Sequence, residues 1–210
     1  MTAKTKATLY GGKGCGSAAV EVMLALADVS YDLIVATPWE PTPALEDLKR
    51  INPLVQVPTL VLPDGTVMTE SAAMMMWLAE RVPEMLPQNA EQRAAFYRWM
   101  TFIPANIYAM FTIRDFPSRW VDDESAQTQL KDRATERMKQ SYAMMENAIA
   151  PGPWLLGNNM NALDIYVAMT THWTPGRKWF AEHCPKILSA VMLAEQHPVI
   201  AKVWERNFGK

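Results

Sequence analysis

Residues 52–71 constrain this chain more than any other segment. They contain a Val57-Pro58 pair, two short β-favouring runs around Pro63-Asp64-Gly65, and a Glu70-Ser71 pair ahead of an apolar helical pattern. Val57-Pro58 presents an extended backbone with no N–H on the proline, and Pro-Asp-Gly is typical of a turn. The free N–H groups at a helix start attract anions. We therefore predict a hairpin that leads into a helix and forms a docking site for a short, charged, peptide-like ligand.

Strand and helix patterns alternate from residue 7 to about residue 81. Apolar residues recur at helical spacing in some segments, whereas others are short β-favouring runs ended by Gly, Pro or Asp. The predicted elements, in order, are a strand over 7–10, a helix over 17–27, a strand over 31–35, a helix over 44–51, a hairpin of 58–62 and 66–68, and a helix capped by Thr69. A strand–helix–strand unit favours a parallel first pair of strands.

Strand patterns nearly vanish after residue 90. A connector over 82–90 holds two prolines, and the rest of the chain has helical periodicity. Pro104 is expected to kink the first of these helices, and Asn161 with Asp164 matches a capping box. The predicted helices cover 91–110, 123–149, 161–169, 185–195 and 198–206. The helix after Asn161 is largely apolar, so we expect it at the centre of a second domain.

Composition excludes several classes of protein. The chain has 210 residues, enough for two small domains. A formal net charge of −2 without a run of Lys or Arg argues against a nucleic-acid partner. No apolar run approaches the roughly 20 residues of a membrane span, and residues 1–8 lack the apolar stretch of a secretory signal. The two cysteines, Cys15 and Cys184, provide neither a disulfide framework nor a metal site. We expect a soluble, cytoplasmic protein without a metal.

Cys15 is the candidate for chemistry. It lies in Gly11-Gly-Lys-Gly-Cys-Gly-Ser17, between the first strand and the first helix. Glycines permit close backbone approach, and the positive end of a helix favours the reactive thiolate. The alternative interpretation of Cys15 is a small buried hydrophobic residue. Cys184 follows His183, and one such pair is too few for a metal site, so we expect a structural role.

In the order and spacing of these motifs the chain resembles the cytosolic glutathione S-transferases. The resemblance rests on the turn 10–17, Val57-Pro58, Glu70-Ser71, the proline-containing connector and Asn161 through Asp164. It implies an α/β thioredoxin-like N-terminal domain over 1–81, a linker over 82–90 and an all-α C-terminal domain over 91–210. It also implies a cis peptide bond before Pro58, glutathione as co-substrate, a homodimer and a role in detoxification. The chain departs from the family in having Leu54-Val55-Gln56 where a glycine is common.

The resemblance also assigns roles to single residues. The backbone of Val57, before Pro58, would pair antiparallel with the cysteinyl backbone of glutathione, and Gln56 would add a polar contact. Ser71 would hold the γ-glutamyl carboxylate and Glu70 the ammonium group. Cys15 falls at the serine position of one bacterial subgroup, and the cysteine position of another subgroup falls on Gly16. Cys15 and Ser17 are therefore both candidates to contact the glutathione sulfur.

The second substrate would lie between the domains in a family member. Aromatic residues near the kinked helix suggest a small apolar electrophile, although ordinary core packing explains each of them equally well. The candidate residues are Trp39, Tyr108, Phe111, Arg114 and Trp120, with Phe116 and Trp173 nearby. Three functions remain open: transfer of glutathione to an electrophile, glutathione-dependent thiol transfer or lyase chemistry with covalent use of Cys15, and a non-catalytic protein-binding adaptor.

Overall fold

The computed structural model describes residues 6–39 and 41–209, which form two compact units. One unit comprises Met1–Leu86 with Ala194–Lys210, and the other comprises Pro87–Leu193. Our expectation about a secretory signal rests largely on residues 1–5, which lie outside the described residues. The elements in chain order are β1 (Ala7–Gly11), α1 (Ser17–Leu26), β2 (Tyr31–Val35), α2 (Pro43–Ile51), β3 (Thr59–Val61), β4 (Val67–Met68), α3 (Ser71–Ala79), η1 (Pro83–Met85), α4 (Ala90–Phe102), η2 (Ile103–Tyr108), α5 (Ala109–Asp115), η3 (Pro117–Arg119), α6 (Glu124–Ala148), α7 (Ala162–Thr171), α8 (Arg177–His183), α9 (Pro185–Ala194) and α10 (Pro198–Phe208).

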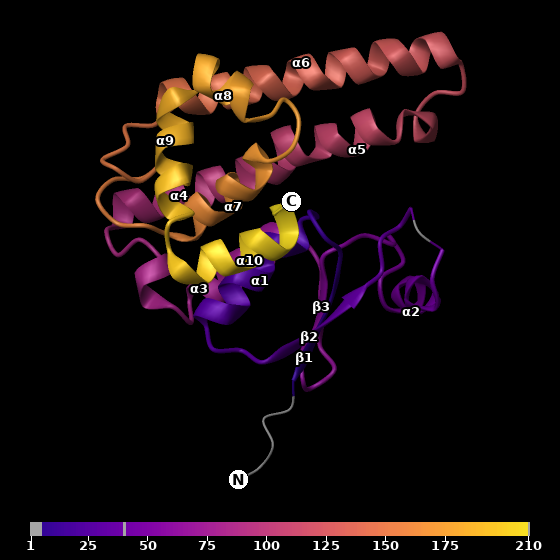
Figure 1. Cartoon of the computed structure of the whole chain (residues 1–210), viewed down its shortest axis with the longest axis horizontal. Coiled ribbons are helices and arrows are strands. Elements are labelled where there is room, and N and C mark those ends of the chain that lie inside the picture. The colour runs from indigo at the N-terminus through magenta and orange to yellow at the C-terminus, as the bar shows by residue number, and fades with distance from the viewer. Residues whose placement is uncertain (1–5, 40, 210) are drawn as a thin grey trace. The chain divides into compact units, whose positions relative to one another are not determined.

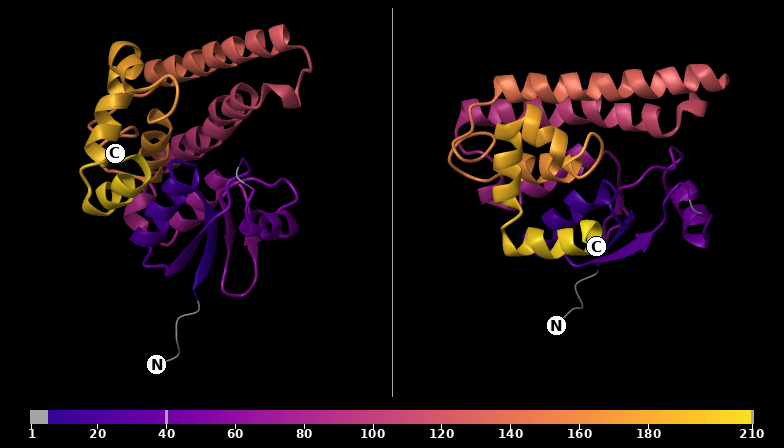
Figure 2. Two further views of the ribbon diagram at one scale, coloured as in Figure 1. Left: turned by 45° about the vertical axis from the view of Figure 1, so that its right-hand side comes forward. Right: turned by 45° about the horizontal axis from the view of Figure 1, so that its top comes forward.

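The first unit is built on a four-stranded mixed sheet. The strand order is β2-β1-β3-β4, with β1 and β2 parallel and the other neighbours antiparallel. The predicted parallel pair and the predicted hairpin are therefore confirmed. Helices α1 and α3 cover one face of the sheet, and α2 covers the other (Figures 1 and 2). This is the thioredoxin-like arrangement that we expected.

Side chains along each strand alternate between the two faces of the sheet, because neighbouring residues of a strand point in opposite directions. Tyr10 packs with Leu45 and Leu48 of α2, whereas Leu9, the adjacent residue of β1, is buried toward the opposite face. Thr42 starts α2 because its hydroxyl accepts the N–H of Leu45 at 3.2 Å.

Helix α10 belongs to this first unit and lies along α1 (Figures 1 and 2). Our expected boundaries placed the whole of 91–210 in the helical domain, so the last segment is a correction. The physical reason is that α1 is apolar on nearly every side and is buried from Ser17 to Leu24. One face of such a helix packs on the sheet, and the other needs a cover. The buried side chains of α10, Ile200, Val203 and Trp204, form its apolar face.

The second unit is entirely helical over its described elements. Helix α4, the π-helical segment η2 and α5 follow one another and run beside α6 (Figure 2). Pro104 lies in η2, where we expected a kink. Since proline has no N–H to donate, the regular helix ladder is interrupted at this residue. The hydroxyl of Ser141 in α6 lies 3.3 Å from the C=O of Asn106 in the altered segment and 2.9 Å from the C=O of Arg137, so its one proton is shared between these two acceptors.

Helix α7 is the centre of the second unit. All ten of its residues are buried, as the apolar pattern predicted. The predicted capping box is confirmed: the side chain of Asn161 accepts the N–H of Leu163 at 3.0 Å, and Asp164 accepts the N–H of Asn161 at 2.9 Å. The same carboxylate also accepts the N–H of Leu155 at 2.8 Å, which fixes the preceding loop on the helix start.

Within residues 6–39 and 41–209, no helix combines the length and the apolar character that crossing a membrane requires.

Candidate functional site

The loop between β1 and α1 is closed by Ser17. The hydroxyl of Ser17 accepts the N–H of Gly12 and donates to its C=O, both at 3.2 Å. Ser17 is 0% exposed, and a Cβ placed on Gly11 would stand 2.4 Å from the Cβ of Ser17. Glycine is therefore required at residue 11, and Ser17 uses both of its hydrogen-bonding functions to hold the loop.

Cys15 lies in the same loop, two residues before the first residue of α1. It is 8% exposed. Its N–H donates to the C=O of Gly12 at 3.2 Å and its C=O accepts the N–H of Ala18 at 3.1 Å. The Sγ atom lies 3.7 Å from the C=O of Lys13. The sulfur thus stands at the positive end of a buried helix, where an anion is stabilised.

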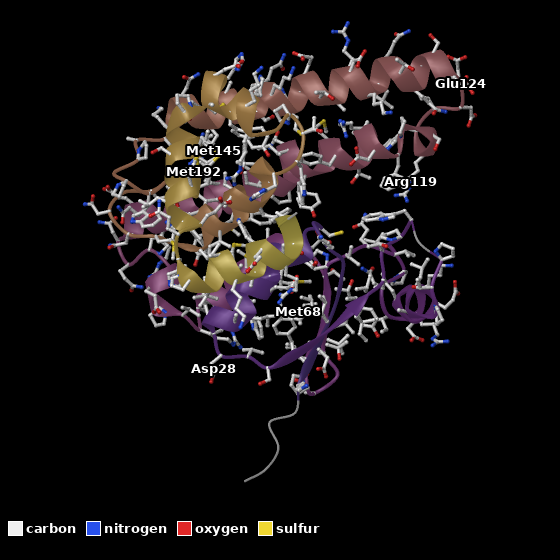
Figure 3. All side chains as sticks on the ribbon, in the orientation of Figure 1. Asp28, Met68, Arg119, Glu124, Met145 and Met192 are labelled. Carbon is white, nitrogen blue, oxygen red and sulfur yellow. The ribbon has the colours of Figure 1, made fainter. Side chains whose placement is uncertain are left out.

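The sheet register brings the three predicted binding segments to one edge of the first unit. Tyr10 of β1 pairs with Thr59 of β3, so the loop that follows β1 and the Val57-Pro58 segment that precedes β3 meet at the same end of the sheet. Leu60 pairs with Met68 in the antiparallel hairpin of β3 and β4, so the chain leaves β4 toward Glu70 at this same end of the sheet. Met68, labelled in Figure 3, marks the end of β4 from which the chain enters α3.

Val57 offers its backbone to a ligand. The Val57-Pro58 peptide bond is cis, as the resemblance implied. Among the described residues, neither the N–H nor the C=O of Val57 has a hydrogen-bond partner. By contrast, the C=O of Gln56 accepts from Asn52 Nδ2 at 3.2 Å and from Thr59 Oγ1 at 2.8 Å, while the Gln56 side chain is exposed. A strand-like segment with unused donors and acceptors can take up a peptide backbone.

Val55 explains how the chain manages without the glycine that is common in the resembled family. Its φ is +52°, in the left-handed region that glycine tolerates best and that a β-branched residue rarely adopts. Val55 nevertheless packs against the cluster of Tyr10, Leu45 and Leu48. This apolar contact, which glycine could not make, favours valine at residue 55.

The start of α3 is the third part of the edge. Thr69 was expected to cap this helix, but the cap position is held by Glu70, with φ +62° and no side-chain capping bond. The carboxylate of Glu70 is exposed and has no hydrogen bond or ion pair to the described residues. Ser71, half-buried, is the first helical residue. The arrangement sets an acidic side chain beside helix N–H groups, which suits a ligand that carries both an ammonium and a carboxylate.

The candidate electrophile residues divide between the two units. In the second unit Tyr108 and Phe111 each meet Trp173 edge to face, with ring centroids 5.4 and 5.1 Å apart. Arg114 pairs with the neighbouring Asp115. Trp120 is 58% exposed and makes no ring contact among the described residues. Trp39 lies in the first unit and is 53% exposed. The structure therefore joins Tyr108 and Phe111 to Trp173 and leaves Trp120 outside this cluster.

Cys184 has the structural surroundings that we expected. It is fully buried, and burial, with a smaller effect of the Glu146 carboxylate, raises the pKa of its thiol to about 12. A thiol of this kind stays protonated and inert. Within the described residues, no three His, Cys, Asp or Glu side chains form a group that could hold a metal ion.

Two buried polar residues escaped the sequence interpretation. Glu21 is 0% exposed in α1, and Asn207 of α10 bonds to it and to Gly14 of the Cys15 loop. The signal for Glu21 was a single acidic residue inside the apolar run 17–26, since a buried carboxylate needs partners. Local periodicity holds no comparable signal for Asn207.

Comparison with known proteins agrees with this architecture. A family model described as the N-terminal domain of glutathione S-transferase matches residues 17–81. YncG, an uncharacterised GST-like protein of Escherichia coli K12, is 33% identical over 201 residues, which cover 95% of this chain and 97% of that protein. The glutathione S-transferase GstA of Escherichia coli O157:H7 is 24% identical over 158 residues, 74% of this chain and 75% of GstA.

Solved structures share the fold. A glutathione transferase homologue from Sulfitobacter, crystallised with bound glutathione, superposes with a TM-score of 0.83 at 23% identity and covers 96% of this chain and 98% of its own. A glutathione S-transferase from Methylobacterium radiotolerans, in complex with glutathione sulfonate, has a TM-score of 0.77 at 22% identity and covers 95% and 94%. Together with the nearly full-length similarity to YncG, these findings show that the chain belongs to the glutathione S-transferase family.

Proposed function

We propose that the first unit binds glutathione and activates its thiol for attack on a small apolar electrophile. The observation that carries the proposal is the unpaired backbone of Val57, which lies at the same edge of the sheet as the Cys15 loop and the start of α3. The cysteinyl N–H and C=O of glutathione pair with Val57. The γ-glutamyl carboxylate binds Ser71 and the first amides of α3, and the ammonium group faces Glu70.

Cys15 is the side chain that we assign to the glutathione sulfur. The hydroxyl of Ser17 is committed to Gly12 on both its donor and its acceptor side. A hydrogen bond from the Cys15 thiol and the field of α1 both favour the ionised glutathione sulfur. In a substitution the thiolate forms the carbon–sulfur bond while the leaving group departs with the electron pair of its bond to carbon. In an addition the carbon–sulfur bond forms while the π electrons of an activated double bond move onto the electron-withdrawing group, and a proton from water completes the product. The aromatic cluster that Tyr108 and Phe111 form with Trp173 is the candidate apolar surface for the electrophile.

Thermal unfolding with and without glutathione tests the binding step. A ligand that binds only the folded state stabilises it by about 1.4 kcal/mol at ten times its Kd, and we expect Tm to rise by about 3–5 °C. Ser71→Ala removes most of this rise, whereas Ser125→Ala, at an exposed residue of α6, leaves it intact. A constant Tm at millimolar glutathione contradicts the proposal and favours the protein-binding adaptor.

Covalent thiol transfer through Cys15 is the second candidate within the same site. One observation favours it: of the two cysteines, Cys184 is fully buried with a raised pKa, so Cys15 is the thiol available for exchange. Its thiolate would attack the sulfur of a glutathione mixed disulfide, form a Cys15–glutathione disulfide and release the other thiol. Peptide mass spectrometry after incubation with oxidised glutathione should find the adduct on Cys15. Absence of the adduct excludes the covalent route and favours transfer of glutathione to an electrophile.

Self-association is the remaining part of the proposal. Helix α3 carries Met76 and Trp77 half-exposed on the first unit, and Arg81 stacks over the Trp77 ring at 3.6 Å. An apolar helix face of this kind suits contact with a second copy. Sedimentation of the purified chain should give the mass of a dimer, and a monomer at micromolar concentration excludes it.

A further inference from the structure

A chain of buried polar contacts joins the C-terminal helix to the loop that carries Cys15. Asn207, in the last turn of α10, is 5% exposed. Its Oδ1 accepts the N–H of Gly14 at 3.1 Å. Its Nδ2 donates to Oε1 of Glu21 at 3.2 Å and to the C=O of Val203 at 3.1 Å. The side chain of Asn207 therefore links residues 193 positions apart in sequence, all within the first unit.

Glu21 fixes which way the Asn207 amide points. The carboxylate of Glu21 is fully buried in α1 and accepts from Tyr31 Oη at 3.2 Å and from Arg206. Because an ionised carboxylate only accepts hydrogen bonds, the face of the amide toward Glu21 must be its NH₂ group. This leaves Oδ1 as the group that faces Gly14. Burial, followed by the Glu21 carboxylate, raises the pKa of Tyr31, so Tyr31 keeps the proton that it donates.

The contact acts on the residue next to Cys15. Gly14 has φ +71°, a conformation that favours glycine, and a Cβ on Gly14 would be in ordinary van der Waals contact, at 3.6 Å, with the backbone oxygen of Asn207. Ser17, which follows Cys15, holds Gly12. The segment that precedes the cysteine is thus anchored at two residues, Gly12 by a side chain of α1 and Gly14 by a side chain of α10.

We propose that Asn207, oriented by Glu21, is a positioning residue that holds the Cys15 loop in its reactive geometry. The expected effect of Asn207 on turnover rests on the proposed function. Its expected effect on the conformation of the Cys15 loop does not. Since the anchor comes from α10, the reactivity of Cys15 depends on a helix at the far end of the sequence. The hydrogen bonds of the Asn207 side chain go to Gly14, Glu21 and Val203 and not to Cys15, and in this proposal Asn207 does not contact glutathione.

The first test measures alkylation of Cys15 by iodoacetamide, followed by peptide mass spectrometry, in the full-length chain. Asn207→Leu keeps the size of the side chain and removes both amide functions. We expect Cys15 to react about fivefold faster, the change in loop opening that one lost hydrogen bond accounts for. Val203→Ala is the matched control, because it weakens the packing of α10 but keeps all three hydrogen bonds of the Asn207 side chain, including the one to the backbone C=O of residue 203. Its Cys15 should react at the wild-type rate.

The second test follows turnover with glutathione and an aryl halide. Asn207→Leu should lower kcat about fivefold and change KM for glutathione by less than about twofold, because the tripeptide backbone is held elsewhere. Glu21→Gln should act in the same direction, since its amide no longer fixes the orientation of Asn207. The alkylation assay contains no glutathione. It therefore tests the role of Asn207 even if the protein does not bind glutathione.

Hydrogen exchange on the wild-type chain keeps the proposal testable even if both variants fail to fold. The amide of Gly14 should be protected to the same degree as the amides of α10, whereas the amide of Lys13, which has no hydrogen bond among the described residues, should exchange fast. The proposal is overturned if Gly14 exchanges as fast as Lys13. Equal alkylation rates in the wild type and Asn207→Leu, or equal acceleration in Val203→Ala, overturn it too.

Discussion

Ser17 and Cys15 lie in one glycine-rich turn, and their hydrogen bonds assign them different tasks. Ser17 is fully buried and its hydroxyl closes the loop on Gly12. Cys15 keeps a small exposed fraction and its sulfur makes a long contact of 3.7 Å to a carbonyl. From the sequence both residues were candidates to contact the glutathione sulfur. Residue type and spacing alone do not reveal which hydroxyl or thiol is used in hydrogen bonds within the loop.

This difference leads to opposite outcomes for the two alanine variants. Cys15→Ala should keep the stability of the wild type to within about 1 kcal/mol and lower kcat/KM for an aryl halide about tenfold or more, through loss of a donor to the thiolate. Ser17→Ala leaves the buried N–H of Gly12 without a partner and should cost about 1–3 kcal/mol of unfolding free energy. Undiminished conjugation in Cys15→Ala would remove Cys15 from the mechanism.

At the scale of helices and strands, local patterns predicted most of the architecture. The alternation of strands and helices up to residue 81, the hairpin around Asp64-Gly65 and the start of α7 at Asn161 are as expected, because turn residues and capping boxes act within a few residues. Two details differ. Helix α8 was not expected, and α3 begins with Glu70 rather than Thr69 at the cap, since the hairpin register sets where the chain turns.

The buried cap of α7 should give stability a specific pH dependence. Burial raises the pKa of Asp164 to about 7, from 3.8 in the unfolded chain, against the lowering effect of its backbone N–H partners. Between pH 4 and 7 the unfolded chain has released this proton and the folded chain still holds it. The free energy of unfolding contributed by Asp164 therefore falls as pH rises through this window and is level above it.

Urea unfolding of the wild type and Asp164→Asn at several pH values isolates this contribution. The stability of the wild type minus that of the variant should decrease from pH 4 to pH 7 and stay constant at higher pH. A difference that is constant or increases over the same range means that the buried carboxylate is already ionised at pH 4.

At the scale of the whole molecule, the assignment of α10 to the first unit was beyond sequence interpretation. The pattern predicted a helix over 198–206 and the structure has one over Pro198–Phe208, but periodicity shows that a face is apolar, not which surface it covers. The sequence around Gly14 and around Asn207 does not indicate that these two distant residues are hydrogen-bonded. The same holds for the aromatic cluster of Tyr108, Phe111 and Trp173, whose members were named but whose contacts were not.

Deletion of α10 should destabilise the first unit severely. Ile200, Val203 and Trp204 are all less than a tenth exposed, and burial of each large apolar side chain is worth about 1.5–3 kcal/mol. A chain that ends at residue 196 should therefore lose several kcal/mol, comparable with the stability of a typical domain. Lys202→Ala, at an exposed residue of the same helix, should be neutral. A truncated chain that melts at the wild-type temperature would show that α1 needs no cover.

A crystal structure of the chain grown with saturating glutathione tests the central claim most directly. We predict that the cysteinyl backbone of the tripeptide pairs with the N–H and C=O of Val57, that its γ-glutamyl carboxylate lies at Ser71, and that its sulfur faces Cys15. An empty edge at saturating ligand, or a tripeptide whose sulfur points away from the loop between β1 and α1, contradicts the account.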